Sequence, residues 1–349
     1  MIIVMRTGTS EENIQHVVRK IEEAGLKPHL SRGQFQTIVG AIGDEAKVAA
    51  LPFTAMPGVE QALPIVHPWK IASRQMHPEN TVIKVGSVEI GGGKMVAMAG
   101  PCTVENRQML WDSAAACKKA GAQILRGGCF KPRTSPYDFQ GLGVEGLKLL
   151  RECGDEFGLP VVTEVRSITH VAPACLYADI LQIGARNMQN FDLLKEVGRQ
   201  SKPVMLKRGM AATVKDFLMA AEYILAAGNP NVMLCERGFR TFETATRFTL
   251  DVGAFPWLAE NTHLPLIVDP SHAAGKASLV PALARAGIAA GAAGFIIEVH
   301  CNPEEALCDG PQALKPDRFT PLVKELEQIF DLVHPRQAAP AAPAATPGR

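Results

Sequence analysis

The sequence of 349 residues has almost no net charge, because 36 lysine and arginine residues are balanced by 35 aspartate and glutamate residues. A protein that binds nucleic acid or an anionic membrane through its overall field needs a strong excess of basic residues. The balance therefore excludes a general nucleic-acid or membrane partner. Any binding of anions has to come from a local cluster of basic side chains.

The sequence also lacks a long uninterrupted apolar run. The N-terminal MIIVMRTGTS has no basic segment followed by an apolar stretch and a small-residue cleavage site, so no signal peptide is expected. The most apolar stretch, residues 279–297, contains Arg285 and many Gly and Ala residues. It predicts a helix, a turn and a strand rather than a membrane span. We expect a cytoplasmic protein.

Eight cysteines are present, but no pair has the C-x-x-C spacing. This spacing argues against a zinc ribbon and against a disulfide framework. Most of the cysteines are expected to be buried small apolar side chains, with Cys102 as the exception discussed below. The tail, residues 337–349, is Ala- and Pro-rich and is expected to be disordered because it cannot bury a core.

The first 66 residues alternate between strand and helix patterns. They predict a strand at 2–5, a helix at 10–24, strands at 28–32 and 36–41, a helix at 44–51 and a strand at 59–66. This alternation is typical of a small ferredoxin-like α+β domain, whose open sheet face commonly packs against a copy of itself. Residues 67–80, which contain Pro68 and Pro78, are predicted to form a linker.

Residues 81–336 show a different pattern, a short hairpin followed by eight repeats of a strand and a helix. The predicted strands are 95–99, 123–126, 161–165, 180–183, 204–207, 232–235, 266–268 and 295–299. Short, almost wholly apolar strands indicate a parallel sheet buried on both faces. The count of eight favours a closed (β/α)8 TIM barrel, and a doubly wound open sheet ranks second.

Polar or ionisable residues follow every predicted strand, whereas the opposite strand ends carry mostly Gly, Pro, Ala and Leu. In a barrel the active site is built from these C-terminal ends. So many basic groups around one mouth predict a phosphorylated ligand, since the arginine fork fits phosphate and carboxylate. The alternative is a set of structural residues, ion-paired for example with Glu164 or Glu236. The basic residues are Arg126, Lys131, Arg186, Lys207 and Arg237.

A second group of strand-end residues has the donor atoms of a metal site. Cys102 follows the first barrel strand, His272 the seventh and Glu298 the eighth, and Asp309 lies in the next loop. Sulfur, nitrogen and oxygen donors together suit a borderline divalent ion, Mn, Fe, Co or Zn, better than Ca. His300 competes with His272 as a ligand and is otherwise a residue that supports one.

With these residues in view, the sequence resembles the 3-deoxy-D-arabino-heptulosonate 7-phosphate (DAHP) synthase family, in the form with an N-terminal ferredoxin-like extension. The likeness covers residues 1 to about 335. The motifs that carry it are Cys102 in AGPC, KPRTS at 131–135, IGAR at 183–186, LKRG at 206–209, ERG at 236–238, DPSH at 269–272 and EVH at 298–300.

The resemblance implies a metal-dependent condensation of phosphoenolpyruvate with erythrose 4-phosphate, the first step of the shikimate pathway. It implies a metal held by Cys102, His272, Glu298 and Asp309. It implies a phosphoenolpyruvate site made by Arg126, Lys131, Arg186, Lys207 and Arg237. It implies an erythrose 4-phosphate site made by Arg133, Thr134 and Ser135.

In this chemistry C3 of phosphoenolpyruvate attacks an aldehyde, whose oxygen needs a Lewis acid as it gains negative charge. Lys131 is expected to protonate that oxygen, so Lys131, Cys102 and His272 are the predicted catalytic residues. The rival family is 3-deoxy-manno-octulosonate 8-phosphate synthase, which uses arabinose 5-phosphate and typically carries an A-N-R-S-S stretch. Residues 132–135, PRTS, favour the four-carbon aldose.

In the family that the chain resembles, the ferredoxin-like extension senses an aromatic amino acid at an interface between two such domains and closes over the barrel mouth. His29 and Ser31 match the effector pocket, and the effector is Tyr or Phe. A homo-oligomer, dimer or tetramer, follows from this reading. A hypothesis of another class is a non-enzymatic barrel that binds a phosphorylated metabolite and has no need of Cys102.

Overall fold

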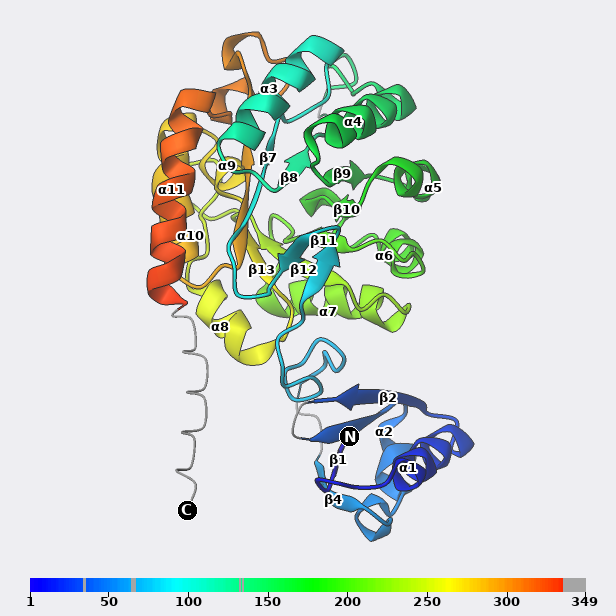
Figure 1. Ribbon diagram of the computed structural model, residues 1–349. Coiled ribbons are helices and arrows are strands. Elements are labelled where there is room, and N and C mark those ends of the chain that lie inside the picture. Colours follow the sequence, from blue (N-terminus) through cyan, green and yellow to red (C-terminus); the bar gives the residue numbers. More distant parts are fainter. Residues whose placement is uncertain (34–35, 64–66, 132, 134, 335–349) are drawn as a thin grey trace, which may run out of the picture.

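The computed structural model describes residues 1–33, 36–63, 67–131, 133 and 135–334. The described residues form a small N-terminal sheet domain and a closed eight-stranded parallel barrel (Figure 1). The fold class predicted from the sequence is therefore correct, and the open-sheet alternative is excluded. The predicted disorder of the tail concerns residues outside the described part of the chain. Within the described part, no helix combines the length and the apolar character needed to cross a membrane.

The N-terminal domain has the ferredoxin-like order of elements. These are β1 (Ile2–Met5), α1 (Glu11–Glu23), β2 (Lys27–Arg32), β3 (Thr37–Ile42), α2 (Glu45–Ala50) and β4 (Val59–Leu63). The strands form an antiparallel sheet in the order β2-β3-β1-β4. Helix α1 begins where the Ser10 side chain accepts a hydrogen bond from the Asn13 backbone N–H. Its helically spaced Ile14, Val17 and Ile21 are buried against the sheet.

The barrel strands lie within a few residues of their predicted positions. They are β7 (Val96–Gly100), β8 (Ile124–Arg126), β9 (Val161–Val165), β10 (Ile180–Ile183), β11 (Val204–Lys207), β12 (Val232–Glu236), β13 (Leu266–Val268) and β14 (Gly294–Glu298). All eight run parallel, and the register Glu298↔Gly100 between β14 and β7 closes the barrel. Parallel strands buried on both faces explain why the strands are nearly all apolar.

Helices cover the outside of the barrel, except for the short α9 (Pro270–Ala274), which lies at the C-terminal end of β13 and carries His272. They are α3 (Arg107–Lys119), α4 (Gly143–Phe157), α5 (Ile168–Tyr177), α6 (Phe191–Gly198), α7 (Val214–Ala226), α8 (Ala254–Asn261), α9 (Pro270–Ala274), α10 (Val280–Ala289) and α11 (Pro316–Val333). The last helix packs against α10 and α3, next to the point of closure (Figure 1). There the ring of Phe295 on β14 meets the edge of Phe319 on α11, and both side chains are fully buried.

A hairpin closes the end of the barrel opposite the mouth. Its strands are β5 (Ile83–Val85) and β6 (Val88–Ile90). Their inward side chains join one apolar cluster with residues of the barrel interior such as Met98, Met205 and Ile267. The barrel is therefore filled from below, and a ligand can enter only from the C-terminal ends of the strands.

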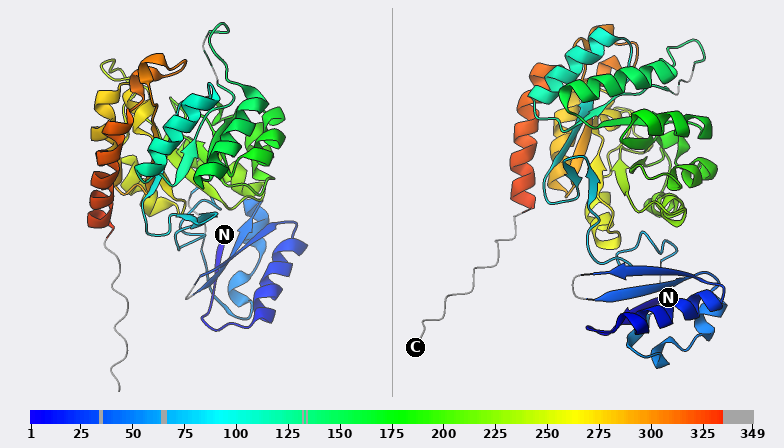
Figure 2. Two further views of the ribbon diagram at one scale, coloured as in Figure 1. Left: turned by 45° about the horizontal axis from the view of Figure 1, so that its top comes forward. Right: turned by 45° about the vertical axis from the view of Figure 1, so that its right-hand side comes forward.

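The segment predicted as a linker is packed on the barrel rather than extended through solvent. Trp69, Ile71 and Ala72 belong to the main apolar core, and the Glu222 carboxylate on α7 accepts hydrogen bonds from the backbone N–H groups of Ile71 and Ala72. The ferredoxin-like domain, which precedes this segment in the chain, lies at the end of the barrel opposite the mouth (Figures 1 and 2). Within one chain it therefore does not cover its own barrel mouth.

Candidate functional site

A cavity of about 440 Å³ opens at the C-terminal ends of the barrel strands. Its walls come from the loops that follow the strands, where the sequence predicted the site. Three charged residues that the sequence analysis did not select, Arg240, Arg247 and Asp138, also line it. The other charged or polar lining residues are Lys131, Arg133, Glu164, Gln182, Arg186, Lys207, Arg237, His272, Cys308 and Asp309.

Cys102 reaches this site because of the glycine that precedes it in AGPC. Gly100 ends β7 with a positive φ of 151°, a conformation that side chains disfavour. A Cβ at this position would lie 2.2 Å from the carbonyl oxygen of Arg126. Only glycine allows β7 and β8 to approach so closely, and the chain then turns so that the Cys102 thiol is buried beside the cavity.

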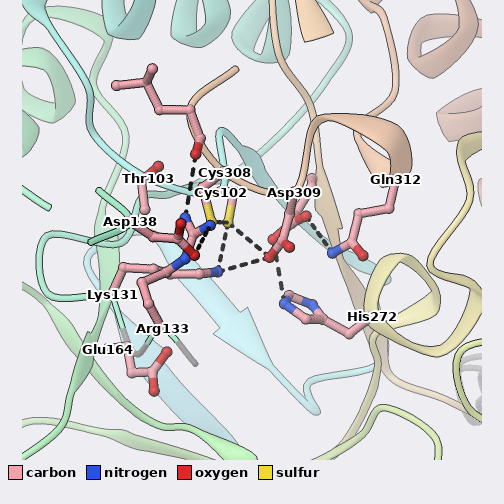
Figure 3. Close-up of polar contacts among 12 residues, drawn as sticks. Cys102, Thr103, Lys131, Arg133, Asp138, Glu164, His272, Cys308, Asp309 and Gln312 are labelled. Carbon is pink, nitrogen blue, oxygen red and sulfur yellow. Dashed lines mark hydrogen bonds and ion pairs between the residues drawn. The ribbon is translucent and has the colours of Figure 1, made fainter. Parts of the chain in front are cut away.

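The four predicted metal donors, although far apart in the sequence, fall into two groups that share Asp309: one contains Cys102, the other His272 and Glu298. Cys102, His272 and Asp309 are labelled in Figure 3. Cys102 Sγ is 3.3 Å from Asp309 Oδ2, and His272 Nε2 is 3.4 Å from Glu298 Oε1. A nitrogen and an oxygen bound to one tetrahedral ion lie about 3.4 Å apart, and a sulfur and an oxygen about 3.6 Å. Each of the two pairs therefore has the spacing of two ligands of one divalent ion. Asp309 connects the sulfur side of the set to the imidazole side.

Asp309 adopts an unusual backbone conformation. It has a φ of 52°, and no other non-glycine residue in the described part of the chain has a positive φ. Such a conformation costs free energy and persists where the surrounding structure holds it. Here η5 (Gly310–Gln312) follows directly, and Lys131 Nζ donates to Asp309 Oδ2 at 2.9 Å. The strained backbone keeps the carboxylate in the donor cluster.

Further polar groups hold the donors in place. Asp269 Oδ2 accepts from Lys207 Nζ at 2.5 Å and lies 2.8 Å from His272 Nδ1, so the opposite ring nitrogen faces Glu298. Gln312 Nε2 donates to Glu298 Oε2 at 2.7 Å. Contacts of this kind are typical of metal sites, because they fix the orientation of each ligand.

The electrostatics of the cluster favour the deprotonated forms of Glu298 and His272. Burial opposes ionisation of Glu298, but His272, Arg126 and Lys131 outweigh it and lower the pKa of Glu298 to about 2. Burial lowers the pKa of His272 to about 4, against the attraction of Asp269 and Glu298, so the imidazole is neutral at pH 7. A carboxylate and a neutral imidazole are the forms that bind metal ions.

The thiol of Cys102 lies next to the ammonium of Lys131. Burial raises the pKa of the Cys102 thiol. Lys131 Nζ lies 2.7 Å from Cys102 Sγ, and the negative groups around it raise the pKa of Lys131 against the effect of burial. The site therefore holds a proton donor next to the donor cluster.

The five predicted cations divide into two groups. Arg126, Lys131 and Lys207 are ion-paired with Glu298, Asp309 and Asp269, so part of the structural alternative is correct. These partners differ from the two glutamates suggested by the sequence. Glu164 accepts a hydrogen bond from Gln182, and Glu236 accepts one from Arg208. The second group consists of the two remaining predicted cations, Arg186 and Arg237.

Arg237 is the clearest sign of an anionic ligand. Its side chain is 5% exposed, and its Nε and Nη1 atoms find no hydrogen-bond partner within the described part of the chain. The guanidinium lies 4.3 Å above the Phe248 ring, and burial lowers its pKa. Such a group is costly to bury without a partner. It lines the cavity together with Arg186 on η2 (Ala185–Asn187).

The residues of the KPRTS run are only partly placed at the cavity. Arg133 lines it and donates to Asp138 at 3.1 Å and to the Leu307 carbonyl at 3.3 Å. Ser135 is not part of the lining, and its hydroxyl accepts from the Tyr137 backbone N–H. Thr134 lies outside the described residues.

The predicted effector residues are remote from this cavity. His29 lines a separate cavity of about 520 Å³ between the ferredoxin-like domain and the lower end of the barrel, together with His77 and His263. Ser31 is buried in β2 and is not part of that lining. The two residues are therefore not brought into one pocket by the described part of the chain.

Besides Arg240 and Asp138, the prediction missed Cys308, Gln312 and Arg247. Cys308 carried a signal, since it immediately precedes the predicted ligand Asp309. Gln312 and Arg247 carried none, because an amide in a loop and an arginine beyond the eight strand ends are common surface residues. In the structure Arg247 Nη1 donates to Gln312 Oε1 at 2.7 Å, and Gln312 in turn holds Glu298.

Comparisons with known proteins agree with this geometry. A family model described as the DAHP synthetase I family matches residues 73–333, and one described as the DAHP synthase ferredoxin-like domain matches residues 1–67. Phospho-2-dehydro-3-deoxyheptonate aldolase from Thermotoga maritima is 50% identical over 331 residues, which cover 95% of this chain and 98% of that protein. A crystal structure of this Thermotoga maritima aldolase, also called DAHP synthase in its description, has a TM-score of 0.76, with 48% identity over 95% of this chain and 97% of that one.

The rival family is more distant. A 2-dehydro-3-deoxyphosphooctonate aldolase from Geobacter sulfurreducens is 33% identical over 270 residues, which cover 72% of this chain and 98% of that protein. In contrast, a second solved structure of a DAHP synthase, a truncated form from Thermotoga maritima, is 48% identical over 76% of this chain and 97% of that one, with a TM-score of 0.71. The ferredoxin-like unit and the higher identity over nearly the whole length separate the two families. The chain belongs to the DAHP synthetase I family, and its N-terminal unit is a DAHP synthase ferredoxin-like domain.

Proposed function

We propose that the enzyme condenses phosphoenolpyruvate with erythrose 4-phosphate and water, giving DAHP and phosphate in the first step of the shikimate pathway, and that it needs a divalent metal to do so. The observation that carries the proposal is the buried guanidinium of Arg237, whose Nε and Nη1 atoms have no hydrogen-bond partner among the described residues and which lines a cavity next to a metal-type donor cluster. A phosphorylated substrate satisfies that group. Family membership supports the identity of the reaction.

In this proposal the cations bind phosphoenolpyruvate. Arg186 and Arg237 are available for the phosphate, because no ion pair engages either of them within the described part of the chain. The already paired Arg126, Lys131 and Lys207 lie nearer the donor cluster. They are assigned to the carboxylate and the reacting end of the substrate.

Arg133, Thr134 and Ser135 are proposed to bind erythrose 4-phosphate. Arg133 is the best supported of the three, because it lines the cavity. Its contacts to Asp138 and to the Leu307 carbonyl are exposed and can be exchanged for a phosphate at little cost.

Cys102, His272, Glu298 and Asp309 are proposed to hold the metal, which is Mn, Fe, Co or Zn. When bound, such an ion supplies a Lewis acid for the aldehyde oxygen. Asp269 contacts Nδ1 of His272, and Gln312 donates a hydrogen bond to Glu298. Each contact keeps the ligand in its orientation.

The protein's own groups then account for the proton and for the water. C3 of phosphoenolpyruvate attacks the aldehyde carbon, and Lys131 donates a proton to the aldehyde oxygen as the new bond forms. Water adds to C2, and phosphate leaves with cleavage of its C–O bond. Glu164 is better placed than Asp269 to orient this water, because Glu164 lines the cavity while Asp269 is 1% exposed and engaged with Lys207.

The decisive experiment uses the purified enzyme stripped of metal with a chelator. Phosphoenolpyruvate is added with erythrose 4-phosphate or with arabinose 5-phosphate, metals are returned singly, and the loss of enol absorbance is followed. Turnover with the four-carbon aldose that depends on metal is expected. Turnover without metal refutes the metal mechanism, and a preference for the five-carbon aldose refutes the substrate assignment.

A non-enzymatic barrel is the second hypothesis, and Cys102→Ala separates the two. The variant is expected to lose condensation and keep phosphoenolpyruvate binding, because the cations remain. Unchanged condensation in this variant contradicts the proposed metal site.

The ferredoxin-like domain is proposed to sense an aromatic amino acid, Tyr or Phe, at an interface between copies of the chain in a dimer or tetramer. His29 and Ser31 are the proposed effector residues. The position of the domain below its own barrel supports an arrangement in which a mouth is covered by a different copy (Figure 2). A variant that lacks residues 1–66 tests this assignment. Inhibition by Tyr or Phe that persists in this variant refutes it.

A further inference from the structure

A second cysteine lies beside the proposed metal ligand. Cys308 Sγ is 3.5 Å from Cys102 Sγ, and Cys308 is 4% exposed (Figure 3). Cys102, Cys308 and Asp309 form a group whose donor atoms all lie within 4.8 Å of one another. Asp309 also belongs to the group formed with His272 and Glu298. The two groups therefore share one carboxylate and enclose one region of the mouth.

The sulfur–sulfur distance has the value expected for two ligands of one ion. Two thiolates bound at about 2.3 Å with a tetrahedral angle between them lie about 3.8 Å apart. The observed 3.5 Å is close to this value and needs only a small side-chain adjustment. The same cluster already attracts positive charge, since Lys131 Nζ lies 2.7 Å from Cys102 Sγ.

Cys308 is not a core residue of the ordinary kind. The buried cysteines Cys117, Cys153 and Cys235 all belong to apolar core clusters. Cys308 belongs to no apolar cluster in the described part of the chain and instead lines the polar cavity. A buried thiol on a polar wall, next to a carboxylate and a second thiol, has a chemical rather than a packing environment.

We propose that Cys308 is a second thiolate donor to the metal, so that the site binds a thiophilic ion through two sulfurs. The inference rests on the proposed metal site and extends it. When Cys308 is added to Cys102, His272, Glu298 and Asp309, the donor set changes from one that tolerates Mn²⁺ to one that selects Zn²⁺, Co²⁺ or Fe²⁺, because soft sulfur ligands favour these ions. Serine at this position would give a harder site with the same shape.

The test is a cobalt titration of the chelator-stripped, fully reduced enzyme. Near-ultraviolet absorption from sulfur-to-cobalt charge transfer reports the number of thiolates bound. Cys308→Ser is expected to retain about half of the wild-type intensity, because one sulfur of two remains. Its Zn²⁺ affinity is expected to fall on the order of ten- to a hundredfold, while its Mn²⁺ affinity changes by less than about threefold. Cys175→Ser is the matched control, since Cys175 contacts Gln200 between α5 and α6 and is expected to change neither quantity.

The outcomes distinguish this inference from the proposed function. Equal intensity in the wild type and in Cys308→Ser overturns the inference and leaves the metal site intact. A spectrum without any sulfur band, or one unaffected by Cys102→Ser, overturns the metal site itself. A measurement on the wild type alone is independent of variant folding. Bound Zn²⁺ is expected to protect both Cys102 and Cys308 from alkylation, as identified by peptide mass spectrometry, and protection of Cys102 alone overturns the inference.

Discussion

Glu298 offers a direct test of how the active-site charges are balanced. Its side chain is 1% exposed, with Oε1 accepting from Arg126 Nη1 and Oε2 accepting from Gln312 Nε2, both at 2.7 Å. Glu298→Gln keeps the shape of the side chain and removes its charge. The Arg126 guanidinium, which is also buried, then has no counter-ion within hydrogen-bond distance among the residues that the structure describes. We expect the metal-free enzyme to lose stability.

The magnitude follows from the pKa of the carboxyl group. His272 helps to lower the pKa of Glu298 only where the imidazole is protonated, below about pH 4, whereas Arg126 and Lys131 also act at pH 7. The whole shift from 4.5 to about 2 corresponds to about 3 kcal/mol, at about 1.4 kcal/mol for each pKa unit, so the stabilisation at pH 7 is at most about 3 kcal/mol. This contribution is fully present above pH 4.5 and is lost as the pH falls toward 2. Removing one partner of a buried ion pair typically costs 3–5 kcal/mol, so a loss of roughly 3–5 kcal/mol is expected for Glu298→Gln.

Denaturant unfolding at pH 7 with excess chelator measures this loss without a contribution from bound metal. The matched control is Glu325→Gln, whose carboxylate pairs with Arg285 on the surface at 46% exposure. The control is expected to change the free energy of unfolding by less than about 1 kcal/mol. If Glu298→Gln changes stability no more than the control, the carboxylate is not stabilised by its neighbours as we have argued.

Three further predictions concern separate parts of the molecule. Burial lowers the pKa of His263 to about 4, so the unfolded chain binds the proton more tightly than the folded chain between pH 4 and 6.5, and stability falls as the pH drops through this window. The wild type is expected to lose about 2 kcal/mol more than His263→Gln between pH 7 and pH 5 in chemical unfolding, and an equal loss contradicts the assignment. Thr213→Ala removes the capping box at the start of α7 and is expected to cost about 1 kcal/mol, whereas no change in denaturation midpoint argues against the cap. Lys131→Met is expected to lower kcat on the order of a hundred- to ten-thousandfold with a native circular dichroism spectrum, and a variant that keeps a tenth of wild-type kcat excludes Lys131 as the proton donor.

Much of the fold was already determined by local sequence patterns. The strands β9, β10, β11 and β13 begin and end at the predicted residues, β8 and β12 differ by one residue at one end, and β7 and β14 are shifted by one residue at both ends. A run of apolar residues between turn signals specifies a buried strand wherever it lies, and helical spacing specifies α4 or α7 in the same way. Because these signals act over a few residues, they do not depend on the rest of the chain.

The list of site residues also came from the sequence, through one topological rule. If eight parallel strands close, their C-terminal ends face one mouth, so Cys102, His272 and Glu298 are candidates before any distance is known. Which candidates contact one another was not determined. The pairing of Arg126 with Glu298 rather than with Glu164 depends on which strands become neighbours when β14 meets β7.

Only the tertiary structure decided what lies between the strand ends. Cys308 and Gln312 join the site because the loop after β14, which contains the left-handed Asp309, folds back over it, and Arg247 joins from the segment between β12 and α8 by its contact with Gln312. The place of the ferredoxin-like domain below the barrel was likewise undetermined, since it depends on contacts such as Lys27 Nζ to the Ala226 carbonyl. Periodicity and turn chemistry are local and can be read along the chain, whereas the meeting of residues two hundred positions apart depends on packing, which no local pattern encodes.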